Sequence, residues 1–185
     1  YGNTFRRTDG LRIFGDRHQV FSNYFEDNST GINLGNGGAE VADGAPLTSH
    51  DRPDNVVIAF NTLVNNATHY KMSRRTPLAL GATGITFANN VIVGGGKAAV
   101  IEGPYPAALW SGNLLWKTGG AGDLPADGYA EIDPLLAPDA HGIHRLQAGS
   151  PAIDSASGGY PAVVADLDGQ PRTIAKDKGA DEFSE

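Results

Sequence analysis

The 185-residue sequence contains no cysteine and no apolar run near the length of a membrane span. Without cysteine, disulfides cannot contribute to folding and thiols say nothing about the redox compartment. A membrane helix needs about eighteen or more consecutive apolar residues, so we expect no membrane partner. No stretch has a helical period, which predicts very little helix. The 25 Gly and 11 Pro suit short strands joined by many turns.

Positive charge is scarce in the last third of the chain. The formal net charge is −7, which by itself disfavours a polyanionic partner, and we expect no nucleic-acid partner. However, residues 1–120 hold ten Lys or Arg against nine Asp or Glu, whereas residues 121–185 hold four against twelve. The acidity therefore belongs to the tail, and the first part can present a basic face.

One pattern recurs four times between residues 19 and 116: a short apolar strand leads into an Asn, and a second short apolar strand leaves it. These residues are Asn23, Asn61, Asn90 and Asn113, at steps of 38, 29 and 23 residues. A strand repeat of a few tens of residues with variable length is typical of a solenoid with loop insertions. The sequence predicts an all-β fold, a right-handed parallel β-helix with three faces per coil.

An Asn at every corner has two physical reasons. Asn tolerates the left-handed backbone conformation that a tight corner needs. When coils stack, each side-chain amide can also hydrogen-bond to its neighbour in a ladder. We therefore predict that the four Asn stack at one corner.

The remaining segments complete the predicted coils and a tail. A strand is expected at residues 11–15, third strands of the coils are expected at residues 31–35, 78–81 and 99–103, and residues 36–54 form a long loop.

Residues 1–123 are predicted to be β-helix coils, and residues 124–185 an irregular capping segment packed on them. Val163, Val164 and Phe183 are too few apolar anchors for a separate core. The first residues look like a coil in progress, so we expect the C-terminal half of a longer solenoid, with an N-terminal β-helix half as its partner.

Several stretches resemble known β-helix proteins. The tail motifs GSPAID, DLDGQPR and KGADEF are similar to the C-terminal segments of many secreted bacterial β-helix proteins. The stretches GLRIFGDRHQVFSNYFEDNSTGINL, NVVIAFNTLVNN and GITFANNVIVGG resemble polysaccharide lyase family six, the alginate lyase and chondroitinase B group. The resemblance covers essentially the whole chain. It implies β-elimination on an anionic uronate polymer, most simply alginate, by a secreted or periplasmic bacterial enzyme.

The family's catalytic residues are not found in this sequence. The resemblance implies Ca²⁺ held by an Asn and two Glu, a Lys base and an Arg near the leaving group, in Glu-x-Glu, Lys-Ser and Arg-His-Gly contexts. None of these contexts occurs here. The chain resembles the family from just past the catalytic Arg. We therefore expect Ca²⁺ in the complete enzyme, no metal ion and no catalytic residue in these 185 residues, and no lyase activity from them alone.

Substrate binding is the role that this part of the chain can retain. Arg12 lies between Leu11 and Ile13, and period-two alternation directs it outward if they point inward. The resemblance implies that this Arg contacts a substrate carboxylate, and a solvated surface Arg is the alternative. Arg17 and His18 follow in the next turn as further candidates, although a turn His commonly only faces solvent.

A second basic and aromatic patch contains Tyr70 and Lys71, which we predict as substrate contacts, followed by Arg74 and Arg75. His69 and Tyr70 resemble the acid-base pair of unrelated uronate lyases. Adjacent strand residues point to opposite faces, so we do not expect them to act together.

Other functional readings remain open. A non-catalytic glycan-binding or adhesin module could share this scaffold and tail. A pectate-lyase-like or hydrolase enzyme would need paired carboxylates, and the outward positions Arg12, Asn33 and Ala79 offer none. We interpret residues 166–169 as a turn rather than a Ca²⁺ loop, and Trp110 and Trp116 as packing residues.

Overall fold

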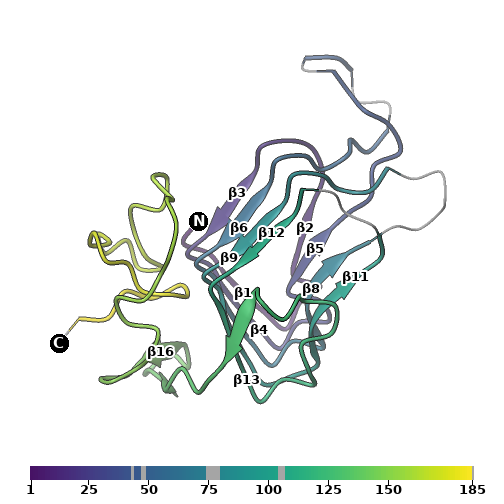
Figure 1. The fold of residues 1–185 in the computed structure, drawn as a ribbon. Helices are drawn as coiled ribbons and strands as arrows, with labels where there is room; N and C mark the ends of the chain where they lie inside the picture. Colours follow the sequence, from purple (N-terminus) through teal and green to yellow (C-terminus); the bar gives the residue numbers. More distant parts are fainter. Residues whose placement is uncertain (43, 47–48, 74–79, 104–106, 185) are drawn as a thin grey trace.

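A computed structural model describes residues 1–42, 44–46, 49–73, 80–103 and 107–184 of the chain. These residues form strands and turns without a helix. None of them belongs to a helix long and apolar enough to cross a membrane. Three parallel sheets enclose one core, with successive strands passing from sheet to sheet (Figure 1). The prediction of an all-β parallel β-helix is confirmed.

Each sheet takes one strand from each of the first four coils, and one of the sheets has two further strands. The six-stranded sheet consists of β1 (Thr4–Arg6), β4 (Tyr24–Glu26), β7 (Thr62–Val64), β10 (Val91–Val93), β13 (Asn113–Trp116) and β14 (Tyr129–Glu131). A second sheet consists of β2 (Leu11–Ile13), β5 (Ile32–Leu34), β8 (Thr68–Met72) and β11 (Lys97–Ile101). The third consists of β3 (Gln19–Phe21), β6 (Val57–Ala59), β9 (Thr86–Ala88) and β12 (Leu109–Ser111). In the tail, β15 (Leu136–Pro138) and β16 (His144–Leu146) form an antiparallel pair.

Apolar residues at equivalent positions of the coils form columns inside the solenoid. The six-stranded sheet contributes Phe5, Phe25, Leu63, Ile92 and Leu115, which lie in register. The Phe5 and Phe25 rings stack with centroids 4.8 Å apart. Alternation places every second residue of a strand inside, so short strands with one or two inward residues suffice to bury a continuous core.

The Asn residues form the predicted ladder at one corner. The side-chain amides of Asn23, Asn61 and Asn90 each donate to Oδ1 of the ladder Asn on the next coil, at 3.0 Å. Asn3 adds a further rung at 3.0 Å, and Asn113 ends the ladder by donating to the Gly128 carbonyl at 2.9 Å. The stacking of the four predicted Asn at one corner is confirmed.

The left-handed residue at this corner is not the Asn, which corrects the sequence-based expectation. Positive φ occurs one residue earlier, at Ser22, Phe60, Asn89 and Gly112, with values of 51°, 56°, 51° and 66°. The reversal at that residue turns the Asn side chain into the interior. There the Asn61 amide also reaches the carbonyl of Ala59 at 3.0 Å.

In the coil that contains Asn61, the third strand lies at a different place from the one predicted. The sequence pattern placed it at residues 78–81, of which 78 and 79 lie outside the described residues. The strand is instead β8, whose Tyr70 and Met72 point into the core and pair in register with Ile32 and Leu34 of β5. Leu80 makes only an isolated antiparallel bridge with Gly37 in the long loop.

The coils continue beyond the predicted boundary between residues 123 and 124. Strand β14 pairs in parallel with β13, and Leu124 belongs to the main core. The boundary prediction is therefore too early. The strand after Trp116 was missed because Tyr129–Glu131 carries none of the apolar alternation of earlier coils, with a half-buried residue followed by two exposed ones.

The tail packs along the side of the coils (Figure 1). Its apolar residues cover the outer faces of the strands: Ile143 meets Tyr24 and Val64, Leu146 and Ala152 meet Val91 and Leu114, and Val163 meets Phe21 and Phe60. These outward residues are apolar because the tail removes them from water.

A buried ion pair within the tail holds Arg172 against the Asn corner of the coils. Arg172 Nη1 lies 2.9 Å from Glu182 Oε2, and the two side chains are 0% and 4% exposed. The Arg172 guanidinium also lies 5.2 Å from the Phe60 ring centroid and donates to Ser22 Oγ at 3.3 Å. The DLDGQPR and KGADEF motifs that contain this pair thus have a structural role in docking.

Candidate functional site

The outer face of the β2-β5-β8-β11 sheet carries a row of polar residues. Arg12, Asn33 and Lys71 occupy equivalent positions on β2, β5 and β8 and lie in register. Arg12 is exposed, and Asn33 and Lys71 are half-buried. Neighbouring strands lie about 4.8 Å apart, so the row spans about 10 Å. The prediction that Arg12 and Asn33 face outward is confirmed, whereas Ala79 lies outside the described residues.

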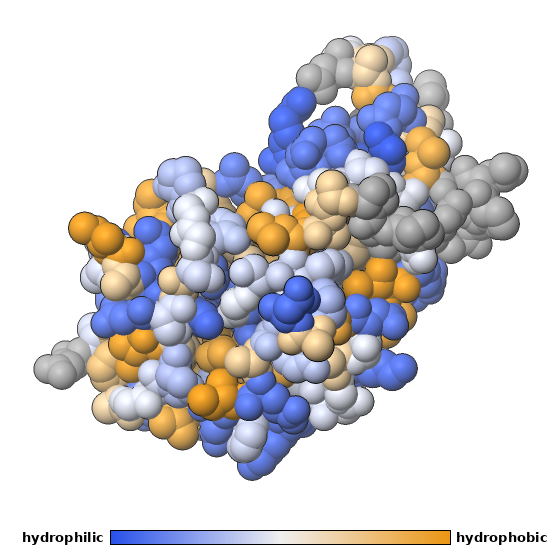
Figure 2. Space-filling view, in the orientation of Figure 1, coloured by the Kyte–Doolittle hydropathy of each residue, from blue (hydrophilic) through white to orange (hydrophobic). Residues whose placement is uncertain are grey.

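Arg12 lies at one end of this row and rests on an aromatic side chain. Its guanidinium carbon is 4.8 Å from the centroid of the Phe14 ring. The Phe14 ring stacks in turn on the His50 imidazole, with centroids 4.1 Å apart and planes 10° apart. His50 comes from the loop at residues 36–54, whose described part projects from the coils (Figure 1). Figure 2 shows many hydrophilic residues on this projection.

A hollow of about 210 Å³ adjoins Arg12. Its lining includes Arg12, Phe14, His18 and Gln19, together with the apolar residues Leu11, Ile13 and Val20. The structure thus brings together Arg12 and His18, two of the predicted site residues. His18 Nε2 lies 2.7 Å from the Phe14 carbonyl, so its hydrogen bond closes the turn between β2 and β3.

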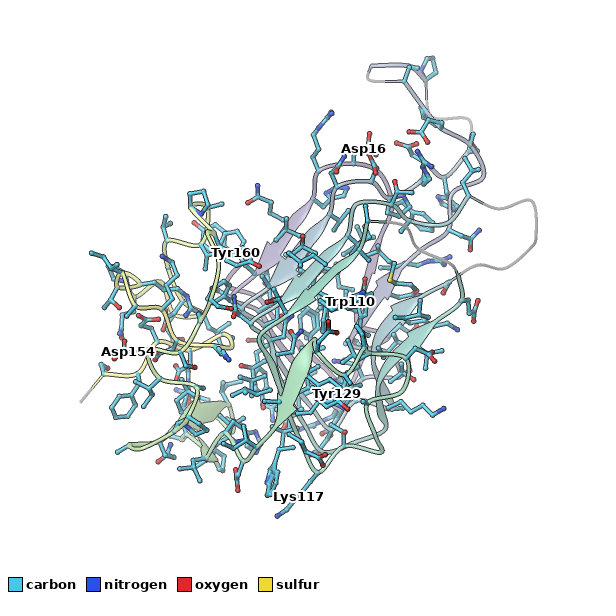
Figure 3. All side chains as sticks on the ribbon, viewed as in Figure 1. Asp16, Trp110, Lys117, Tyr129, Asp154 and Tyr160 are labelled. Atoms are coloured by element: carbon cyan, nitrogen blue, oxygen red, sulfur yellow. The ribbon has the colours of Figure 1, made fainter. Side chains whose placement is uncertain are left out.

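Arg17 lies at the same turn but in acidic surroundings. Burial raises the pKa of Asp16, the neighbouring carboxylates of Asp51 and Asp54 raise it further, and the Arg17 charge opposes them. Figure 3 shows Asp16 at the corner beneath the projecting loop. Part of the Arg17 charge is therefore balanced by protein carboxylates.

Lys71 occupies the middle of the sheet and is also partly balanced. Its Nζ lies 3.4 Å from Glu102 Oε1, and the two side chains are 34% and 42% exposed. A surface ion pair of this kind contributes little to stability, so an anionic ligand can compete with Glu102 for the ammonium group. Asn33, between Arg12 and Lys71, accepts a hydrogen bond from Ser73 Oγ at 3.0 Å, which leaves its amide group as a donor.

Tyr70 does not belong to the site, which corrects its prediction as a substrate contact. It is fully buried, and its ring stacks on Phe87 at 4.4 Å and meets Trp110 edge-on at 5.9 Å. Because Tyr70 points inward in β8, only Lys71 of the pair faces outward. His69 is also fully buried, so the two cannot act as an acid-base pair on a polymer.

The two Trp residues and the two Arg residues that follow Lys71 were also considered in the sequence analysis. Trp110 points into the coil interior, as predicted (Figure 3). Trp116 lies beside Lys117, whose Nζ is 5.4 Å from the ring centroid. Arg74 and Arg75 lie outside the described residues.

The described residues do not fit the Ca²⁺ site that the family resemblance implies. Their only group of carboxylates close enough for a shared ion is Asp166, Asp168 and Asp181. The Arg145 guanidinium lies 2.6 Å from Asp168 and 3.0 Å from Asp181, and Asp166 accepts backbone N–H groups of the turn. These carboxylates already have cationic or hydrogen-bonding partners, and residues 166–169 form the predicted turn.

The fold is that of the alginate lyase-like parallel β-helices. AlyGC, a PL6 family alginate lyase, matches over 94% of this chain and 22% of its own, with 17% identity and a TM-score of 0.62. A point variant of AlyGC matches over 80% of this chain and 24% of its own, with 17% identity and a TM-score of 0.58. The chain thus spans less than a quarter of these lyases. No family model and no curated protein matches.

Sequence reasoning missed two residues of the site. Phe14 follows Arg12 by two positions, so alternation could have placed both on the outer face. His50 gave no signal, because its position depends on how a long irregular loop returns to the coils. The contact of Phe14 with Arg12, and of His50 with Phe14, distinguishes this end of the row from an ordinary solvated surface.

Proposed function

We propose that the chain is the C-terminal part of a polysaccharide lyase that cleaves a uronic-acid polymer, alginate, by β-elimination. Its role is to bind the anionic polymer along the row formed by Arg12, Asn33 and Lys71. The observation that carries this proposal is the row itself: two cations and an amide lie in register on the outer face of a fold shared with alginate lyases. Guanidinium and ammonium groups both bind carboxylates, and Arg does so in a bidentate manner.

In this proposal, the residues that catalyse β-elimination lie on coils outside these 185 residues. A base removes the proton on C5 of the uronate, the glycosidic oxygen leaves and takes up a proton, and a double bond forms in the sugar. Among the described residues, β1, β2 and β3 each lie at a sheet edge, where a further coil can add. We place the base, the acid and any Ca²⁺ on such coils, in an enzyme that is secreted or periplasmic.

A second candidate is a non-catalytic glycan-binding module. The same row favours it, because it can bind an anionic chain without an acid-base pair beside it. Formation of the unsaturated product discriminates between the two candidates.

The test measures binding and product formation separately. Calorimetry on the 185-residue chain should show binding to alginate oligomers that weakens as salt increases, and no comparable binding to neutral dextran. Ultraviolet absorbance should show no unsaturated product from this chain and clear product from a longer protein that contains it. Equal binding of dextran would refute the binding role. Product formed by the 185 residues would place the catalytic groups within them.

A further inference from the structure

We infer that Phe14 is a positioning residue for Arg12, and that the loop carrying His50 holds Phe14 in place. On this account the loop sets how tightly the polar row binds an anionic polymer, although it supplies no charge to that row. The inference rests on the proposed function, because it assigns to Phe14 and His50 a role in the same site.

The Phe14 ring is held on several sides. Arg12 and His50 both contact it, at 4.8 Å and 4.1 Å from its centroid. The backbone of Gly35 on the next coil closes a further side, since a Cβ at Gly35 would lie 2.2 Å from a ring carbon of Phe14. The φ angle of Gly35 is not positive, so the requirement for glycine here is space for the ring. The ring is therefore a rigid platform, although it belongs to an outward side chain.

Two hydrogen bonds within the loop order it around His50, and a third ties it to the coil beside Phe14. The Gly38 amide donates to the His50 carbonyl at 2.7 Å, and the Val41 amide donates to Asp51 Oδ1 at 2.8 Å. The Gly15 amide, next to Phe14, donates to the Asp51 carbonyl at 3.4 Å. These bonds fix the imidazole against the ring from the loop side.

Positioning matters because Arg12 is exposed and has a long, flexible side chain. An Arg that must be ordered on binding loses rotamer entropy, and one already stacked on an aromatic ring loses less. The planar guanidinium suits this stacking and still presents its N–H edge to a carboxylate. Removing the ring should therefore weaken polymer binding while the charge remains.

The test is a double-mutant cycle on binding of alginate oligomers, measured by calorimetry. Phe14→Leu should weaken binding about fivefold when Arg12 is present and have no further effect in the Arg12→Ala background. His50→Ala leaves the coil sequence intact and should weaken binding in the same direction. Phe183→Leu, in the tail, serves as the matched control and should leave binding unchanged. Thermal unfolding of each variant shows whether it is folded.

Nuclear relaxation of the Arg12 Nε–H group in the free protein gives a second readout. Its order parameter should fall in both Phe14→Leu and His50→Ala, and a purely structural role of these residues elsewhere would not change it. An equal loss of binding with Phe14→Leu in both Arg12 backgrounds, or an unchanged order parameter, would overturn the inference. If Arg12→Ala has no effect on binding, the proposed function fails. If Arg12→Ala weakens binding and Phe14→Leu does not, only the inference fails.

Discussion

The side-chain amide of Asn61 donates to Oδ1 of Asn90 at 3.0 Å, which links two coils through fully buried groups. Asn61 also accepts from the Asn23 amide and donates to the Val20 carbonyl at 2.9 Å. Asn61→Ala would leave buried donors and acceptors on both neighbouring coils without partners. We expect it to lower the free energy of unfolding by about 3–5 kcal/mol, measured by chemical denaturation.

Asn65→Gly is the matched control for Asn61→Ala. Asn65 lies on the same coil, is exposed and has a φ of 53°, a left-handed conformation that glycine adopts readily. Its replacement should change stability by less than about 1 kcal/mol. Equal effects of the two substitutions would contradict the assignment of coil stability to the ladder.

Arg172→Met should destabilise the docked tail strongly. The substitution leaves Glu182 buried without its cation, and losing one partner of a buried pair typically costs about 3–5 kcal/mol. Adding Glu182→Gln should recover part of this loss, because it removes the unpaired charge. Arg7→Met, at an exposed position, should have little effect. A stability of Arg172→Met within about 1 kcal/mol of the unmodified chain would show that the pair does not hold the tail.

His69 should make the fold sensitive to acid. Burial lowers the pKa of His69 to about 4, although a hydrogen bond to the Gly94 carbonyl acts in the opposite direction. The unfolded chain, with a His pKa of about 6.5, then binds more protons than the folded chain between these values. The free energy of unfolding should therefore fall as pH drops from 6.5 towards 4, by on the order of 3 kcal/mol.

Urea denaturation at pH 7 and pH 4.5 measures this dependence. His69→Gln, which retains a hydrogen-bond donor but has no titrating group in this range, should show a shallower loss than the unmodified chain. Parallel losses in the two proteins would exclude His69 as the source.

Glu102→Gln should strengthen binding of an anionic polymer. Glu102 lies 3.4 Å from Lys71 Nζ, and its neutralisation leaves the ammonium group available to a substrate carboxylate. The gain should be about twofold to fivefold in affinity, since the pair is exposed to solvent. Glu131→Gln makes the same charge change on an exposed residue of β14 and should have a smaller effect. Weaker binding by Glu102→Gln would mean that Glu102 itself takes part in binding.

The sequence predicts the coils well where a residue has only one way to satisfy its hydrogen bonds. A buried Asn repeated in every coil needs partners for its amide, and the equivalent Asn on the next coil supplies them. The same argument does not reveal which backbone residue reverses the chain. Ser22 and Phe60, rather than Asn23 and Asn61, adopt positive φ, because a side chain aimed inwards requires the reversal one residue earlier.

Features that depend on long-range docking could not be predicted in this way. Tyr70 looks like a surface aromatic in a basic patch, yet its inward position follows from the register of β8 with β5. The tail has scattered apolar residues such as Val163, whose partners on the side of the coils are far away in sequence. The contact between His50 and Phe14 likewise depends on the path of a loop that has no repeat.

The central claim is that the row of Arg12, Asn33 and Lys71 binds a uronate polymer. Its most direct test is the dissociation constant of alginate oligomers for the double variant Arg12→Ala, Lys71→Ala, measured by calorimetry at constant salt. Arg7→Ala, Lys117→Ala removes the same charge at other sites and serves as the control. We expect the first variant to bind at least about tenfold more weakly than the control, which should bind like the unmodified chain. Equal affinities of the two variants would contradict the account.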